Sequence, residues 1–145
     1  ELLKKNYKAV LLGLLAGVLT SLCTVLVLSY IMKLSHEDYV TLLPKSITTA
    51  IGMGVSEELG GYVTITVAVI VVTGVIGNML GEVICKVFKI HEPISKGLAL
   101  GCSAHAIGTA KALEMGEIEG AMSGLAIAVS GILTVILSSI FARFI

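Results

Sequence analysis

Three long stretches of this chain carry no charged side chain, and they restrict its fold more than any other feature. They cover residues 9–32, 62–81 and 120–142, and are 24, 20 and 23 residues long. A helix rises about 1.5 Å per residue and the hydrocarbon layer is about 30 Å thick, so about 20 residues cross it. Each stretch can therefore span a membrane. We predict one all-α membrane domain over residues 1–145, with spans near residues 9–32, 62–88 and 117–142.

The composition excludes most classes of soluble protein. Hydrophobic residues make up 56% of the chain and charged residues 14%, whereas a soluble domain carries about 25% charged residues. Ten Lys and Arg residues balance ten Asp and Glu residues, so no excess charge points to a nucleic acid. The lipid bilayer is the expected surrounding. The three cysteines and three histidines form no metal-binding or catalytic motif, and we expect neither a cofactor nor enzymatic activity.

Two shorter segments, residues 44–61 and 93–112, are too polar and too rich in glycine to be ordinary spans. Each begins with a proline, which suits the first position of a helix. Short, interrupted hydrophobic segments in corresponding positions indicate a binding site in transporters. We therefore predict a polytopic helical bundle with two discontinuous or re-entrant segments, arranged as an inverted repeat.

The lysines predict how these segments lie in the membrane. Positively charged residues beside spans favour the cytoplasmic side. If both lysine groups are cytoplasmic, the segment at residues 44–61 enters and leaves from outside, and the segment at residues 93–112 dips in from inside. This predicts a multi-pass protein of the cell (inner) membrane. The lysines used are Lys4, Lys5 and Lys8 before the first span, and Lys86, Lys89 and Lys96 after the second.

Hydroxyl groups in the two broken segments are candidates for binding a small organic anion. A half-helix that starts inside the bilayer points its first backbone amides at such an anion, and hydroxyls orient it without burying a permanent charge. The alternative is that these small residues only allow the helices to pack closely. The candidate substrate-binding residues are Ser46, Thr48, Thr49, Ser56, Ser103, His105 and Thr109.

Three ionisable residues are candidates for ion coupling. His105 is the only His, Lys, Arg, Asp or Glu residue in residues 97–110, and imidazole exchanges protons near neutral pH; alternatively it is a neutral side chain hydrogen-bonded to a carbonyl. Glu57 binds a proton or Na⁺ in one interpretation and lies at the wet membrane surface in the other. Lys111 either completes an anion site or pairs with the acidic cluster, which we expect to be a solvated connection. That cluster comprises Glu114, Glu117 and Glu119.

Pairs of glycines four residues apart predict close contacts between helices, because they let backbones approach. We expect a compact bundle that assembles as a homo-oligomer. The pairs are Gly13/Gly17, Gly77/Gly81, Gly97/Gly101, Gly116/Gly120 and Gly120/Gly124.

Five motifs together resemble the LrgB/CidB family, which includes antiholin-like LrgB proteins and the plastid glycolate/glycerate carrier. The resemblance runs from about Lys5 to the end of the chain. The motifs are KSITT (45–49), VSEELGG (55–61), GLALG (97–101), SAHAIGTAK (103–111) and EGAMSGLA (119–126).

The resemblance implies one of two functions. One is a carrier of small monocarboxylates such as glycolate, glycerate or pyruvate, with protons as a candidate coupling ion. The other is an antiholin-like regulator of murein hydrolase activity and cell lysis that acts with a holin-like LrgA/CidA partner. The residues favour the carrier, because hydroxyls and a lone histidine in opposed broken segments suit reversible binding of a small anion, which a regulator of a pore does not need.

Overall fold

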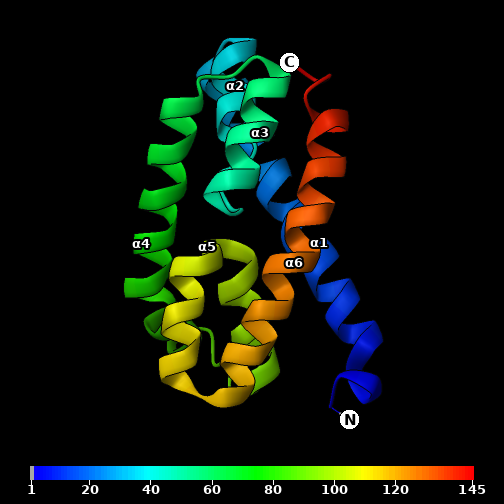
Figure 1. The fold of residues 1–145 in the computed structure, drawn as a ribbon, viewed down its shortest axis with the longest axis vertical. Helices are drawn as coiled ribbons and strands as arrows, with labels where there is room; N and C mark the ends of the chain where they lie inside the picture. The colour runs from blue at the N-terminus through cyan, green and yellow to red at the C-terminus, as the bar shows by residue number, and fades with distance from the viewer. Residues whose placement is uncertain (1) are drawn as a thin grey trace.

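Three long helices form the frame of the molecule. The computed structural model describes the backbone of residues 2–145 and the side chains from residue 6 onward, and all regular structure in this part is α-helical. Helices α1 (Leu2–Met32), α4 (Val63–Val87) and α6 (Glu117–Phe141) each contain a stretch long and apolar enough to cross a membrane. They run along the long axis of the molecule (Figure 1). The prediction of an all-α membrane protein is confirmed.

The first short segment is a hairpin of two helices, α2 (His36–Leu42) and α3 (Thr49–Leu59). Both lie at the end that is uppermost in Figure 1, and the chain enters and leaves the hairpin at that end. The two limbs are neighbours, because Thr66 Oγ1 of α4 lies 2.9 Å from Thr41 O of one limb and 2.8 Å from Ser56 Oγ of the other. We call residues 36–59 the upper hairpin.

The inward limb of this hairpin begins earlier than predicted. The Ser35 hydroxyl accepts from the Asp38 amide at 3.2 Å and caps α2, and Glu37 and Asp38 add favourable negative charge to the first turn. A helix therefore forms where the charge pattern indicated a connection. The expectation that a half-helix begins at Pro44 is wrong, since Pro44 lies in the turn between α2 and α3.

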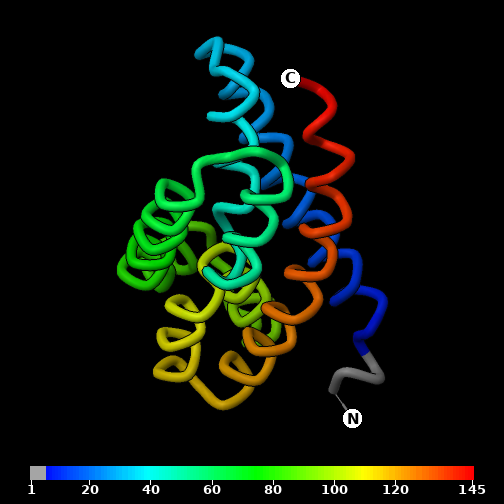
Figure 2. Tube along the Cα trace, turned by 45° about the horizontal axis from the view of Figure 1, so that its top comes forward, coloured from blue at the N-terminus to red at the C-terminus, as the bar shows by residue number. Residues whose placement is uncertain are grey.

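The second short segment is also a hairpin, although its two limbs form one continuous assignment, α5 (Pro93–Met115). The helix is broken at His105, where φ is 43° and ψ is −127°. After the break the chain returns beside itself, because a Cβ placed on Gly108 would lie 2.8 Å from Leu100 O. Figures 1 and 2 show α5 rising from the lower end, turning near mid-height and descending. We call residues 93–115 the lower hairpin.

The two halves of the chain have opposite orientations. Helix α1 is followed by a hairpin that dips from the upper end, and α4 is followed by one that dips from the lower end (Figure 1). This arrangement is the predicted inverted repeat, with α6 added. One detail differs: Pro93 starts its helix at the lower end, so the helix start near mid-height is the one that follows His105.

Glycines set the distance between the hairpins and the long helices. A Cβ on Gly101 would lie 2.7 Å from Ala126 Cβ of α6, and one on Gly74 would lie 2.7 Å from Ile107 Cδ1 of α5. Backbone atoms of Ser123 also obstruct the Cβ at Gly101, so only glycine fits there without moving α5 and α6 apart, whereas at Gly74 the Ile107 side chain would have to move. Close approach was wrongly predicted at Gly13 and Gly124, where nothing lies within 4 Å of an added Cβ.

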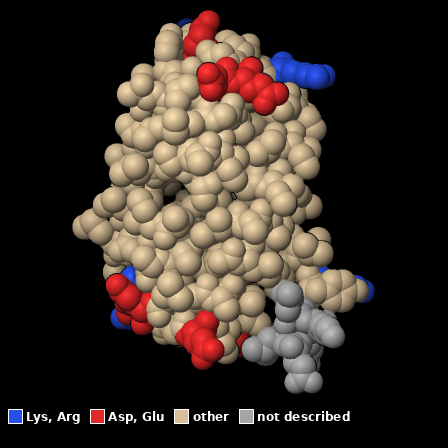
Figure 3. Space-filling view, in the orientation of Figure 1, with Lys and Arg blue, Asp and Glu red and all other residues tan. Residues whose placement is uncertain are grey.

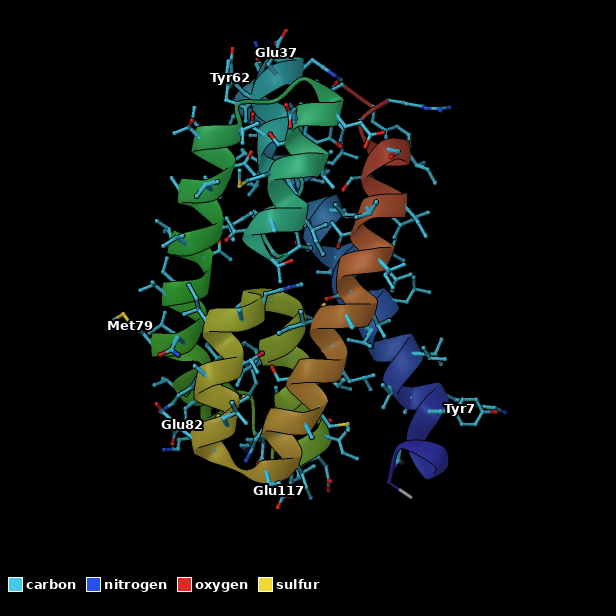
Figure 4. The ribbon with its side chains drawn as sticks, in the orientation of Figure 1. Tyr7, Glu37, Tyr62, Met79, Glu82 and Glu117 are labelled. Atoms are coloured by element: carbon cyan, nitrogen blue, oxygen red, sulfur yellow. The ribbon has the colours of Figure 1, made fainter. Side chains whose placement is uncertain are left out.

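Charged side chains gather at the two ends of the molecule. In the view of Figure 3 the middle band shows no charged residue, while acidic side chains mark both ends. Figure 4 places Glu37 and Tyr62 at the upper end and Glu82 and Glu117 at the lower end, with Met79 pointing outward between them. This distribution suits a bilayer around the middle of the bundle.

Candidate functional site

A cleft of about 650 Å³ lies between α1, the tip of the upper hairpin, α4 and the first limb of the lower hairpin. It brings the tips of the two hairpins to one place, because residues 45–46 and residues 102–103 line the same space. Apolar side chains cover most of the remaining wall. The polar side chains that line the cleft are Thr20, Ser21, Thr24, Lys45, Ser46, Thr73, Ser95 and Ser103.

Lys45 is the one charged residue among those that line the cleft. Its side chain is half-buried, and its Nζ donates to Ser46 Oγ at 2.9 Å. Ser46 Oγ also accepts from Ser21 Oγ of α1 at 3.3 Å. An ammonium has three N–H donors, so this contact orients Lys45 and leaves donors for a ligand.

Analysis of the sequence missed Lys45, although a signal was present. It is the only charged residue between Asp38 and Glu57. An ionisable residue within a membrane-embedded segment is by default a functional candidate. The same rule singles out His105 in residues 93–112 and Lys45 in residues 44–61.

Two helix N-termini meet the middle of the molecule from opposite directions. Helix α3 starts at the tip of the upper hairpin, where Thr48 is in an extended conformation (φ −64°, ψ 143°) and makes no side-chain cap. The second limb of the lower hairpin starts after His105. Each helix N-terminus carries about half a positive charge, so both tips favour an anion near mid-height.

The predicted hydroxyls divide into those in the cleft and those that hold the fold. Ser46 and Ser103 line the cleft. Thr48 and Thr49 lie at the start of α3, beside the cleft rather than on its wall. Ser56 is fully buried and bonded to Thr66, so it fastens the upper hairpin to α4 and is removed from the cleft.

His105 and Thr109 fasten the lower hairpin to α6. His105 Nε2 lies 3.0 Å from Ser130 Oγ, and Thr109 Oγ1 lies 2.7 Å from Ser123 Oγ. Thr109 Oγ1 also donates to His105 O at 2.8 Å. These contacts hold the broken backbone at His105, and neither residue is on the wall of the cleft.

Glu57 and Lys111 lie away from the hairpin tips. Glu57 is exposed near the end of α3. Lys111 forms ion pairs with Glu114 (3.1 Å) and Glu82 (3.4 Å). The hydrogen bonds that Lys111 donates to Glu114 and to Glu82 raise the pKa of its ammonium. Of the two interpretations of Lys111, the structure shows pairing with acidic residues.

The acidic connection between α5 and α6 is less solvated than expected. Glu119 is buried, with 8% of its surface exposed, and its carboxylate occupies the space beside Gly116.

Among the described residues, no group of three His, Cys, Asp or Glu side chains is placed to hold a metal ion.

Comparison with known proteins identifies the family of this fold. The model of the LrgB-like family matches residues 1–144, nearly the whole chain. The chain belongs to the LrgB-like family.

Curated relatives agree with this assignment. The Antiholin-like protein LrgB of Bacillus subtilis (strain 168) is 40% identical over 146 residues, which cover 99% of this chain and 62% of the relative. Proteins with the same name from Bacillus cereus (strain B4264) and Bacillus anthracis (strain CDC 684 / NRRL 3495) are 37% identical over 143 residues, with the same coverage. The chain thus spans about three fifths of the length of these relatives. No solved structure matches it.

Membership of the LrgB-like family and three candidate membrane helices together identify a membrane protein. The two hairpins contain most of the family-like motifs. KSITT forms the tip of the upper hairpin, and SAHAIGTAK forms the tip and second limb of the lower hairpin.

Proposed function

We propose that this LrgB-like chain binds a small monocarboxylate, such as glycolate, glycerate or pyruvate, and takes part in carrying it across the cell membrane without chemical change. The observation that carries the proposal is the position of Lys45, a lone cation where the tips of two opposed hairpins share one cleft. Its ammonium matches one carboxylate. A second carboxylate would find no second cation among the residues that line the cleft.

The remaining polar groups of the cleft suit the rest of such a ligand. Ser46 and Ser21 form a hydroxyl pair next to the Lys45 ammonium, and hydroxyls both donate to and accept from a 2-hydroxy or 2-keto oxygen. The helix N-termini at both tips add positive potential without a titratable group. Ser103 offers a further hydroxyl from the lower hairpin.

The opposed hairpins also provide a way to expose the cleft alternately. In inverted-repeat transporters the site lies between the repeats, and small movements of one repeat against the other open each side in turn. Here the upper hairpin is fixed to α4 through Thr66, and the lower hairpin is fixed to α6 through Ser123 and Ser130. Relative movement of these two bodies would part the tips around Lys45.

The lower end is proposed to face the cytoplasm. Seven of the ten Lys and Arg residues belong to segments at that end, and positive residues favour the cytoplasmic side. The coupling ion is proposed to be the proton, since His105 is buried at the tip of the lower hairpin. Assembly as a homo-oligomer is part of the same proposal.

A second candidate function follows from the names of the relatives. They are called antiholin-like, which favours a regulator of murein hydrolase activity and cell lysis that pairs with a holin-like LrgA/CidA membrane protein. The exposed apolar faces of α1 and α4 would then contact the partner. This function needs the bundle but not the Lys45 ammonium.

One variant separates the two functions. Proteoliposomes of the purified protein should exchange labelled glycolate or pyruvate across the membrane, and Lys45→Met should lose most of this exchange. Lys33→Met is the matched control, because Lys33 is exposed at the upper end of α1 and its loss should change nothing. No exchange by the wild type, together with normal lysis control by Lys45→Met in cells, would favour the regulator over the carrier.

A further inference from the structure

The inward face of α6 is polar along almost its whole length. Its polar side chains are at most 8% exposed, although α6 is one of the candidate membrane spans. Nineteen residues separate the first from the last, which at about 1.5 Å per residue is about 28 Å, close to the thickness of the hydrocarbon layer. The residues are Glu119, Ser123, Ser130, Thr134 and Ser138.

The longest gap in this series is filled by the lower hairpin. Between Ser123 and Ser130 the second limb of α5 supplies Thr109, bonded to Ser123 at 2.7 Å, and His105, bonded to Ser130 at 3.0 Å. We call these seven side chains, the five of α6 with Thr109 and His105, the polar file. Elsewhere on α6 successive hydroxyls are four residues apart, or about 6 Å along the axis, a distance that one water molecule bridges.

Two atoms of the polar file are buried without a protein partner. Ser130 Oγ donates to Ala126 O at 2.6 Å, so its proton is used and it can only accept from His105. His105 Nε2 is therefore the N–H donor, and Nδ1 is a bare acceptor. Among the described residues, neither His105 Nδ1 nor Ser138 Oγ has a hydrogen-bond partner. Such atoms are costly in an apolar interior unless water reaches them.

We propose that the polar file is a proton path along α6, with His105 as its relay. This rests on the proposed function, in which proton movement drives anion movement. His105 Nδ1 takes a proton from a hydronium ion, and Nε2 gives its own proton to Ser130 Oγ while Ser130 turns its O–H from Ala126 O to the next water and passes that proton on. The imidazole then returns to its first tautomer, so the relay neither consumes nor produces protons. Protons and anion then use opposite sides of the lower hairpin, since His105 and the five α6 residues are absent from the wall of the cleft.

Few other ionisable groups surround the relay. The titratable residues on the lower hairpin and on the elements around it include Cys102 and Lys111 on α5, Glu119 at the lower end of α6, Glu82 at the lower end of α4, and Lys45 at the tip of the upper hairpin. Glu82 is occupied by ion pairs. His105 is thus the group with a free acceptor midway along the file.

Proton flux and anion exchange can be measured separately in the same proteoliposomes. A trapped pH-sensitive dye reports proton entry driven by a potassium diffusion potential, and labelled pyruvate reports exchange at equal pH on both sides. Thr134→Val removes one hydroxyl of the file at nearly constant shape. We expect it to lower proton entry at least tenfold and to leave pyruvate exchange within twofold of the wild type.

Two controls make the result decisive. Ser139→Ala removes a neighbouring hydroxyl on the exposed face of α6 and should leave proton entry unchanged. If Thr134→Val unfolds, Thr134→Ser, which keeps the hydroxyl, should retain proton entry, while Ser138→Ala should lose it. Equal proton entry in the wild type, Thr134→Val and Ser138→Ala would overturn the path. Proton entry that depends on Thr134 without any pyruvate exchange would support the path and refute the carrier.

Discussion

The contact between the lower hairpin and α6 can be tested with one methyl group. In Gly101→Ala the new Cβ would lie 2.7 Å from Ala126 Cβ and 2.8 Å from Ser123 Cα, and it would meet Ser123 O as well. Carbon atoms normally approach to about 3.5–4.0 Å. Because two of the three obstructing atoms are backbone atoms, α5 and α6 must separate by roughly 1 Å around this point.

The expected cost comes from overpacking, which destabilises a tightly packed interface by about 1–3 kcal/mol. Alanine also gains about 1 kcal/mol over glycine in any helix. In Gly124→Ala on α6, only the higher helix propensity of alanine acts and there is no packing cost, because nothing lies within 4 Å of the added Cβ. The difference in unfolding free energy between the two variants therefore isolates the packing term, and we expect about 1–3 kcal/mol.

Both variants can be unfolded in mixed micelles by titration with a denaturing detergent, with helicity followed by circular dichroism. Gly101→Ala should unfold at a lower detergent fraction than the wild type, and Gly124→Ala at the same or a higher fraction. If the two variants unfold together, α5 does not pack against α6 in the way described.

Three further predictions concern the upper hairpin, the lower hairpin and the orientation. Thr66→Val leaves Thr41 O and Ser56 Oγ, one on each limb of the upper hairpin, without a buried hydrogen-bond partner and should cost about 1–3 kcal/mol of unfolding free energy. The exposed neighbour Thr64→Val should cost little, and equal unfolding curves for the two variants would argue against these bonds. Asn78→Ala removes the donor to the second limb of α5 and should speed amide hydrogen exchange there, with unchanged exchange as the contrary result. In intact cells an impermeant thiol reagent should label Lys33→Cys and spare Lys89→Cys; the reverse pattern would invert the topology.

Much of the fold could be predicted because the membrane imposes simple rules. Span length, the absence of charge and the side preferred by lysine are properties of sequence position alone. They predicted three spans and two opposed broken segments, and the structure shows three helices long and apolar enough to cross a membrane and two hairpins that enter from opposite ends. The limits of the upper hairpin were wrong because His36–Leu42 is short and polar at its start, and short helices depend on capping and packing more than on composition.

The site was less predictable because it depends on which side chains share a space. Ser46 and Ser103 were selected and do line the cleft, but Ser56 is used to hold α4, and His105 and Thr109 are used to hold α6. All five look alike in sequence as small or polar residues among apolar ones. Packing partners decide between them, as they do for Gly101 and Gly124.

The central claim is that Lys45 holds a carboxylate between the tips of the two hairpins. Its most direct test is the affinity of purified protein for labelled pyruvate or glycolate, compared between the wild type, Lys45→Gln and Lys33→Gln. Loss of a charge-assisted hydrogen bond is worth about 1.5–3 kcal/mol, or roughly a 10- to 150-fold weaker affinity. The account predicts this weakening for Lys45→Gln alone. An unchanged affinity in Lys45→Gln would contradict it.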